Sequence, residues 1–248
     1  MTPSAILKVL STVSSHEVQY LLMGGQACVL YGGAEFSRDC DIAIVCETSN
    51  LGRLQNALDE LQASVIAVPP FEAQYLQRGH AVHFRCHHPE AADMRLDVMA
   101  SMRGVGPFAD LWSRRTTLTL ETNLALELMS LPDLIAAKKT QRDKDWPMIR
   151  RLVEANYAQH RAIPTQEQIH FWLRESRTPE MLIEIAARFP DEASKLTTQR
   201  PLLAEASAAL VESLRQALAC EQDIERATDR NYWEPLKQEL EQLRLGRR

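Results

Sequence analysis

Two aspartates near residue 40 have the type and spacing that divalent-metal chemistry needs. Asp39 and Asp41 are separated by one residue and lead into the apolar run 42–45. On an extended backbone, residues i and i+2 point to the same side, so both carboxylates would face one spot. Carboxylate oxygens are the hard ligands that Mg²⁺ and Mn²⁺ prefer, and a metal with few protein ligands keeps positions open for water and phosphates.

Asp97 is the candidate for a third carboxylate. In the run 95–99, Leu96 and Val98 alternate with Asp97 and Met99, so Asp97 would face away from the apolar side of its strand. An aspartate in the middle of an apolar strand costs stability unless it is paired or binds a metal. The alternative is an aspartate on a solvent-exposed strand face.

Gly24 and Gly25 end the apolar run 20–23, as expected for a buried strand that enters a tight turn. Without side chains, this backbone could turn sharply and bring N–H groups close to a phosphate, aided by the N-terminus of the following helix. A glycine pair or two neighbouring aspartates alone would be weak evidence. The order strand, glycine turn, helix, carboxylate pair and strand is far more specific.

Leu-Met-Gly-Gly at 22–25, followed after thirteen residues by Asp-Cys-Asp-Ile at 39–42, resembles the signature of the DNA polymerase β-like nucleotidyltransferase superfamily. The resemblance implies an α/β (α+β) fold, a mixed sheet flanked by helices, with three acids at one edge. Asp39 and Asp41 would hold the metal bound to the nucleotide. Asp97 would hold a second metal or accept the acceptor proton, and the glycines would contact phosphates.

A narrower resemblance covers residues 134–145, Leu-Ile-Ala-Ala-Lys-Lys-Thr-Gln-Arg-Asp-Lys-Asp, which are similar to a segment of the abortive-infection (type IV) toxin nucleotidyltransferases. It implies nucleotide binding by Lys138, Arg142, Lys144 and Asp145. Positions 138, 142 and 145 would share one helical stripe, where cations could neutralise triphosphate charge and Asp145 could orient one of them. The alternative is a charged helix end, with Asp145 as the cap of the next helix.

One departure from the toxin pattern precedes the carboxylate pair. Glu35 and Ser37 stand where that family often has an arginine and a threonine. Arg38 is the basic residue beside the acid pair, so we expect it to bind the nucleotide instead.

The patterns along the chain predict a nucleotidyltransferase domain over residues 1–150 and a helical domain over 151–248. In the first, we expect helices at 5–13, 26–31 and 51–61, the last capped by Asn50, and strands at 20–23, 41–45, 64–68, 81–86 and 95–99. A short helical stretch should separate the strands at 64–68 and 81–86. Strands at 116–120 and 124–128 should form a hairpin around Thr122 and Asn123. The predicted later helices are 133–142, 147–158, 166–175, 179–189, 202–228 and 232–245.

Composition narrows the function only slightly. A formal net charge of -5 argues against a protein that coats nucleic acid by bulk electrostatics, but it does not argue against a local basic groove. Five cysteines without a CxxC pair predict reduced thiols. The absence of a long apolar run or an export signal predicts a cytoplasmic protein without a membrane segment.

Three histidines around Cys86 have the side-chain type that could form a transition-metal site. His83, His87 and His88 lack partners at the spacings of structural zinc. One of them, close to the third carboxylate, could still touch a nucleotide.

We therefore expect a magnesium- or manganese-dependent nucleotidyltransferase that uses a nucleoside triphosphate such as ATP. The acceptor hydroxyl would belong to an RNA such as tRNA, a protein or a small molecule, and a toxin–antitoxin enzyme would have an antitoxin partner. One alternative is the same fold used as a nucleotide-binding or protein-interaction module with little turnover. Another is a helical regulator whose acids are structural, in which case their side-chain oxygens would not converge.

Overall fold

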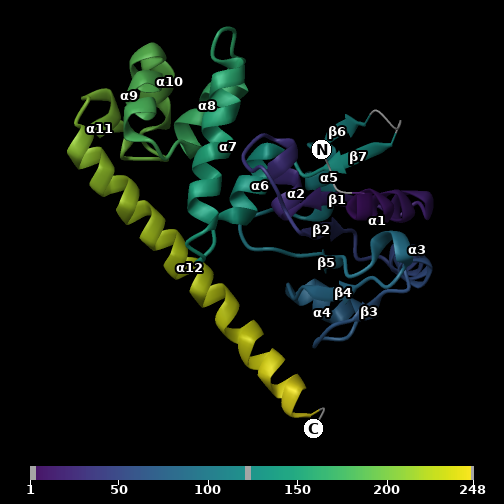
Figure 1. Cartoon of the computed structure of the whole chain (residues 1–248). Coiled ribbons are helices and arrows are strands. Elements are labelled where there is room, and N and C mark those ends of the chain that lie inside the picture. Colours follow the sequence, from purple (N-terminus) through teal and green to yellow (C-terminus); the bar gives the residue numbers. More distant parts are fainter. Residues whose placement is uncertain (1–3, 121–123, 247–248) are drawn as a thin grey trace. The chain divides into compact units, whose positions relative to one another are not determined.

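The computed structural model describes residues 4–120 and 124–246, which fall into two compact units (Figure 1). The first unit comprises residues 1–30, 34–137 and 232–248, and the second comprises 31–33 and 138–231. These units differ from the division expected at residue 150. The first ends before that point along the chain, and the C-terminal segment returns to it.

The described part of the first unit contains a seven-stranded mixed sheet in the order β3-β4-β5-β2-β1-β7-β6. Its strands are β1 Tyr20–Met23, β2 Asp39–Ile44, β3 Ser64–Val65, β4 Val82–Arg85, β5 Arg95–Met99, β6 Thr116–Thr119 and β7 Ala125–Leu128. β2 lies between β1, its antiparallel neighbour, and β5, its parallel neighbour. β1 and β7 are also parallel, and the remaining neighbours are antiparallel. The chain is therefore mixed α/β, as expected.

The strand predictions were accurate where apolar runs are sharply bounded. The predicted bounds of β1 and β5 are confirmed, and β3 and β4 are shorter than predicted. β2 begins at Asp39 rather than Asp41, because its ladder with β5 extends to the pair Asp39 and Arg95. β6 and β7 pair as the expected hairpin. The turn predicted around Thr122 and Asn123 lies outside the described residues.

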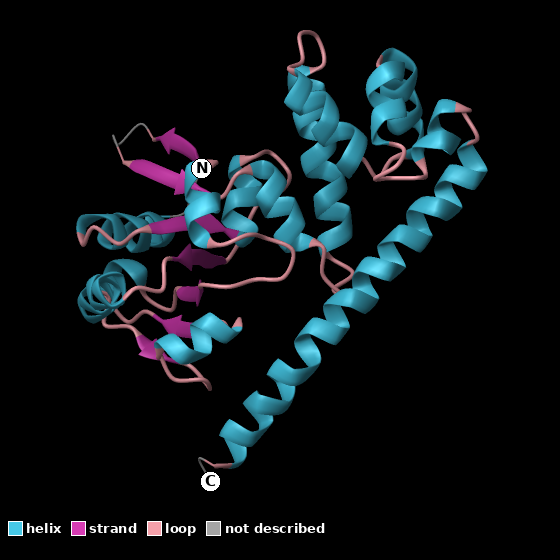
Figure 2. Cartoon of the chain, turned by 180° about the vertical axis from the view of Figure 1, so that it is seen from behind, coloured by secondary structure: helices cyan, strands magenta, loops and turns pink. Residues whose placement is uncertain are grey.

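Short helices surround the sheet of this unit (Figure 2). They are α1 Ser4–Ser15, α2 Gly24–Leu30, α3 Thr48–Glu60, α4 Ala73–Arg78, the 3-10 turn η1 Pro89–Ala91, α5 Phe108–Ser113 and α6 Leu131–Lys138. α1 buries Ile6, Val9, Leu10 and Val13, which recur at helical spacing and so form one apolar stripe. α5 was not predicted.

The predicted capping role of Asn50 is wrong. α3 begins at Thr48, so Asn50 lies inside the helix, where it is fully buried. Its Nδ2 donates to the carbonyls of Gln19 at 3.1 Å and Val45 at 2.9 Å, and its Oδ1 accepts from the N–H of Gln19 at 2.7 Å. Asn50 therefore joins α3 to the chain before β1 and after β2, and these three partly buried hydrogen bonds outweigh its preference for a helix end.

The second unit is helical. It contains α7 Asp145–His160, α8 Gln166–Glu175, α9 Pro179–Arg188, α10 Pro190–Leu196, α11 Leu203–Ser207 and the first part of α12 Val211–Leu245. A capping box of Thr165 and Gln168 starts α8 where it was predicted. Apolar side chains from these helices form the core, including Leu152, Val153, Trp172, Leu182, Ile185, Leu203 and Leu214.

The predicted break between helices at 202–228 and 232–245 is wrong. The chain breaks earlier, around Ala209, whose φ is 55°, and α12 then runs for 35 residues through Pro235. Asp229, at the expected break, is buried in the second unit and accepts a hydrogen bond from the N–H of Gln141 at 2.8 Å. This tertiary contact holds the helix at the point where the sequence suggested a boundary.

Candidate functional site: a carboxylate face on the sheet

The sheet register brings the three predicted acids onto one face. Asp41 on β2 and Asp97 on β5 are register partners, and Asp39 is the partner of Arg95 in the same parallel ladder. Neighbouring residues of one row point to the same side of a sheet, with strands about 4.8 Å apart. β2 and β5 lie side by side in Figure 1. The backbone thus places the acids next to one another.

Two rows of polar side chains cross these strands. His83 on β4 is the partner of Asp97, which extends the row through Asp41, and Arg85 is the partner of Arg95. We call this surface the carboxylate face; it comprises Asp39, Asp41, His83, Arg85, Arg95 and Asp97. All six side chains are of intermediate exposure.

The opposite side of the same strands is apolar. Cys40, Ile42, Val82, Phe84, Leu96 and Val98 are buried there. The prediction that Asp97 faces away from Leu96 and Val98 is therefore confirmed. The Asp97 side chain is only 13% exposed, so the alternative of a freely solvated strand acid does not describe it.

Asp97 is held by two basic side chains. Arg95 Nε donates to Asp97 Oδ1 at 2.7 Å, and His83 Nδ1 lies 2.9 Å from the same oxygen. His83 Nδ1 is also 3.0 Å from Arg95 Nη2, so it donates to Asp97 when protonated and accepts from Arg95 when unprotonated. Burial would raise the pKa of Asp97, but the hydrogen bonds from His83 and Arg95 outweigh it and lower the pKa.

Arg95, like Arg85, is a residue of this face that sequence reasoning missed. Its hydrogen bond to Asp97 raises its pKa, and the charges of Asp39 and Asp41 act in the same direction. The sequence contains a signal that Arg95 shares the face of Asp97, because Arg95 precedes Asp97 by two residues on a strand. The same i, i+2 spacing predicts a shared face for Asp39 and Asp41.

The diglycine makes room for the carboxylate face. α2 starts at Gly24, whose φ is 65°, and a Cβ added there would overlap the Asp41 carboxylate. A Cβ on Gly25 would overlap the Ser37 hydroxyl in the same way. The N–H of Gly25 donates to Asp41 Oδ2 in a long hydrogen bond of 3.4 Å. The structural need for glycine is therefore close packing against Asp41 and Ser37, and the predicted phosphate contacts stay a prediction.

A divalent cation fits this face by position and donor type. In the described part of the chain, however, no three His, Cys, Asp or Glu side chains are grouped so that they could hold a metal ion. Oδ1 of Asp97 is occupied by Arg95 and His83, while Oδ2 of Asp41 faces the Gly25 N–H. The backbone therefore places the three acids on one face, while one oxygen of Asp97 and one of Asp41 contact protein groups.

The predicted basic segment belongs to the second unit, except for the helix that leads into it. Lys138 ends α6 and Asp145 begins α7, so the predicted single helical stripe through 138, 142 and 145 is wrong. The chain is not helical between Lys138 and Asp145, and the side chains contact one another across this non-helical segment. Asp145 lies 3.5 Å from Lys138 Nζ, accepts from Arg142 Nε at 3.1 Å and accepts from Thr140 Oγ1 at 2.6 Å.

Asp145 is the centre of that cluster. It is 3% exposed, and the N-cap position of α7 is taken by the exposed Lys144, so the alternative role of Asp145 as a cap is also wrong. Burial would raise the pKa of Asp145, but the charge of Lys138 and the bonds from Thr140 and Arg142 lower it. Arg38, the other predicted nucleotide ligand, is exposed just before β2.

The three histidines around Cys86 separate into different environments. His87 Nε2 lies 3.0 Å from Ser64 Oγ, and His88 Nδ1 accepts from the Glu90 N–H at the start of η1. Cys86 is buried. Of the three histidines, His83 contacts a predicted carboxylate.

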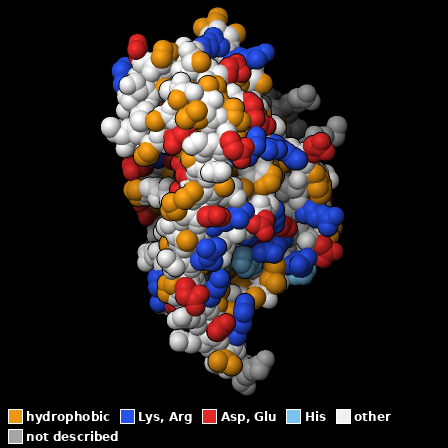
Figure 3. Space-filling model, turned by 90° about the vertical axis from the view of Figure 1, so that its left-hand side faces the viewer, with side chains coloured by type: hydrophobic (Ala, Val, Ile, Leu, Met, Phe, Trp, Pro, Cys, Tyr) orange, Lys and Arg blue, Asp and Glu red, His pale blue; other side chains and the backbone are white. Residues whose placement is uncertain are grey.

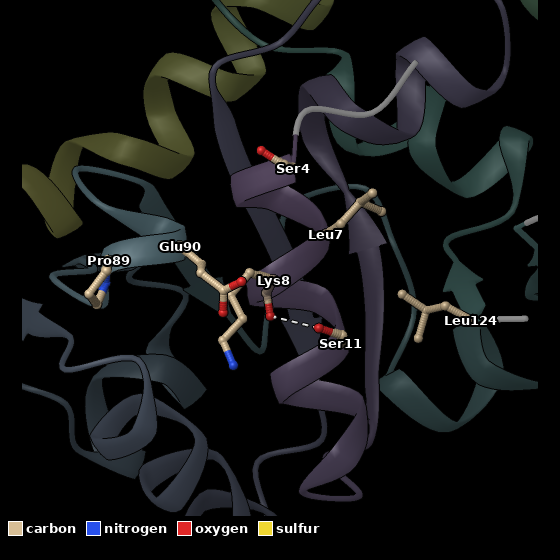
Figure 4. Close-up of a pocket in the computed structure, with 7 residues that line it drawn as sticks. All are labelled: Ser4, Leu7, Lys8, Ser11, Pro89, Glu90 and Leu124. Carbon is tan, nitrogen blue, oxygen red and sulfur yellow. Dashed lines mark hydrogen bonds between the residues drawn. The ribbon is translucent and has the colours of Figure 1, made fainter. Parts of the chain in front are cut away.

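A separate cavity of about 750 Å³ lies beside α1 (Figure 4). Its lining residues are Ser4, Leu7, Lys8, Ser11, Pro89, Glu90 and Leu124. None of these belongs to the carboxylate face. On the surface shown in Figure 3, acidic and basic side chains are interspersed, in keeping with the modest net charge.

Comparison with known proteins adds no relative. No protein-family model matches the chain, and no curated protein gives a significant match. Among the described helices, none combines the length and apolar character that a bilayer-spanning segment requires.

Proposed function

We propose that this chain is a metal-dependent nucleotidyltransferase of the DNA polymerase β-like type. One observation carries the proposal: Asp41 and Asp97 are register partners on adjacent parallel strands, with Asp39 on the same face. The close fit of the Asp41 carboxylate against Gly24 supports it, because the signature pairs a diglycine with these acids. The mixed sheet is compatible with that fold.

The reaction would transfer a nucleoside monophosphate from a triphosphate to an acceptor hydroxyl. Asp39 and Asp41 would bind the Mg²⁺ or Mn²⁺ that accompanies the triphosphate, and Asp97 would bind a second ion or take the hydroxyl proton. A bound divalent ion neutralises phosphate charge and stabilises the attacking and leaving oxygens. Arg38 would bind phosphates beside these acids, and the resemblance separately proposes nucleotide binding by Lys138, Arg142 and Lys144, with Asp145 contacting Lys138 and Arg142.

The proposal also names the classes of acceptor that could supply the hydroxyl. An RNA such as tRNA, a protein side chain and a small molecule each offer a suitable hydroxyl. The resemblance of residues 134–145 to the abortive-infection toxins supports a toxin–antitoxin role, in which a protein antitoxin would be the partner.

A second candidate is a nucleotide-binding or protein-interaction module with little turnover. The observation that favours it is the pairing of Asp97 with Arg95 and His83, which occupies one oxygen of the third acid. The two candidates make different predictions for one measurement.

Each α-³²P-labelled triphosphate would be incubated with the protein, Mg²⁺ or Mn²⁺, and total cellular RNA or protein. We expect label transfer with at least one triphosphate, reduced to background in Asp41→Asn and in Asp97→Asn. Asp59→Asn, at an exposed position on α3, is the matched control and should transfer label normally.

Calorimetry with the same nucleotides separates the two candidates. Nucleotide binding without label transfer would favour the module. Absence of transfer with all four triphosphates, by a protein that is folded by circular dichroism, would contradict the enzyme.

A further inference from the structure

Arg95 places a positive charge within the carboxylate face. It is the register partner of Asp39, donates to Asp97 at 2.7 Å, and its pKa is raised by Asp97, Asp39 and Asp41 in that order of effect. Three carboxylates brought together by the register of β2 and β5 would repel one another. The guanidinium offsets that repulsion, as a bound cation would.

The exposure of the Arg95 side chain allows its guanidinium to move away from Asp97. Its side chain is 38% exposed, whereas that of Asp97 is 13% exposed. An arginine can keep its aliphatic stem packed on the sheet while its head moves into water. The hydrogen bond to Asp97 Oδ1 can therefore break without opening the apolar side of the strands.

The neighbouring Arg85 provides an internal comparison. It is the register partner of Arg95 on β4, on the same face, and its Nη1 donates to the carbonyl of Asp93 at 3.2 Å. Arg85 thus carries the same charge on the same face, but its hydrogen bond is to a backbone carbonyl. The direct bond to a carboxylate distinguishes Arg95.

We propose that Arg95 is an internal counter-ion that holds Asp97 in the metal-free protein and releases it when a divalent cation binds the carboxylate face. Arg95 is then a positioning residue that sets metal affinity through Asp97. This inference rests on the function proposed above, because it concerns the metal of that same site.

Binding of Mn²⁺ without nucleotide, followed by electron paramagnetic resonance of the free ion, tests the proposal. We expect Arg95→Gln to bind Mn²⁺ more tightly by on the order of tenfold, the effect of removing a unit charge a few ångströms from a divalent ion in a largely aqueous dielectric. Arg95→Lys keeps the charge and should bind like the wild type. Arg85→Gln, the matched control, should change the affinity less than Arg95→Gln.

Unchanged or weaker Mn²⁺ binding by folded Arg95→Gln would overturn the proposal, as would an equal gain in Arg85→Gln. A second measurement needs no substitution that could unfold the protein. In wild-type protein labelled with ¹⁵N-arginine, the Nε–H resonance of Arg95, assigned by its absence from Arg95→Lys, should shift as Mg²⁺ is added. A resonance that stays in place at saturating Mg²⁺ would show that Arg95 does not release Asp97.

The outcomes separate this inference from the proposed function. Label transfer by the wild type, together with an Mn²⁺ affinity that Arg95→Gln leaves unchanged, would remove the inference alone. Tighter Mn²⁺ binding by Arg95→Gln without transfer from any triphosphate would remove the enzyme alone. If neither protein binds Mn²⁺ in the absence of nucleotide, the inference fails, and the label-transfer measurement decides separately whether the chain is the enzyme.

Discussion

The Asp41 carboxylate lies where a side chain on Gly24 would have to be, so the first residue of α2 and the second acid of β2 determine each other's position. Gly24 has a φ of 65°, which adds a backbone reason for glycine.

Gly24→Ala should therefore destabilise the protein. We expect a loss of about 2 kcal/mol or more in the free energy of unfolding, from left-handed strain plus the overlap with Asp41. Urea denaturation measures it. Gly52→Ala is the control, because Gly52 lies within α3 with open space around it, and alanine there should stabilise by about 0.5–1 kcal/mol. Equal effects at both positions would contradict this account.

Asn50→Ala should weaken the attachment of α3. The substitution leaves partly buried backbone groups of Gln19 and Val45 without their partner, which we expect to cost about 1–3 kcal/mol in total. The exposed Asn56 lies on the same helix, and Asn56→Ala should be neutral or slightly stabilising. Urea denaturation of the two variants would measure the difference in the free energy of unfolding. A small loss for Asn50→Ala would contradict the role of Asn50 in attaching α3.

Asp145 should contribute to stability in a pH-dependent way. Its pKa in the folded protein is below the ordinary value of 3.8, so the stabilisation is present above that pH and is lost as the pH falls through the folded-state pKa. Asp145→Asn should cost about 1–3 kcal/mol at pH 7 and should lose less stability than the wild type on acidification below about pH 4.

Urea titrations at pH 7, 5, 4 and 3 would record both effects. The control is Asp143→Asn, since the Asp143 side chain is 91% exposed although it pairs with Arg226, and such surface pairs contribute about 0–1 kcal/mol. Parallel pH profiles for the wild type and Asp145→Asn would rule out the assigned role.

Glu239 should hold the C-terminal part of α12 in the first unit. Its two oxygens lie 2.6 Å from His80 Nε2 and 2.8 Å from Arg78 Nη2. His80 is 1% exposed, and its Nδ1 already has no hydrogen-bond partner in the described structure. Glu239→Ala would leave both ring nitrogens of His80 without a hydrogen bond, at a cost of about 1–3 kcal/mol.

Glu241, exposed on the same helix, supplies the comparison for that measurement. Glu241→Ala should leave the urea midpoint nearly unchanged. A midpoint that moves equally in both variants would point to a general effect on α12 rather than to the contact with His80.

The thiols should differ strongly in reactivity. Burial, and then the charge of Asp41, raises the pKa of Cys40 well above its usual range, and burial raises the pKa of Cys86 to about 11. Cys220 is exposed. In native protein at pH 8, Ellman's reagent should therefore react first with Cys220, because the thiolate is the reactive form. Cys220→Ser should remove the fastest phase, and a fast phase that persists would contradict this assignment.

Local periodicity was enough for part of the site. The bounds of β1 and β5 and the face of Asp97 were predicted correctly, because alternation along a strand depends on neighbouring residues alone. The same rule placed Asp39 and Asp41 on one side of β2. The mixed α/β class followed from the order of these patterns.

The pairing of Asp41 with Asp97 and the capture of Asp97 by Arg95 and His83 were decided only by the tertiary structure. Strand order and register depend on hydrogen bonds between segments that are distant in sequence, and periodicity within one strand does not specify them. For the same reason the buried role of Asn50, the course of α12 through Pro235 and its return to the first unit were not predicted. The sequence determined which side chains share a face of each strand, and the fold determined which of them meet.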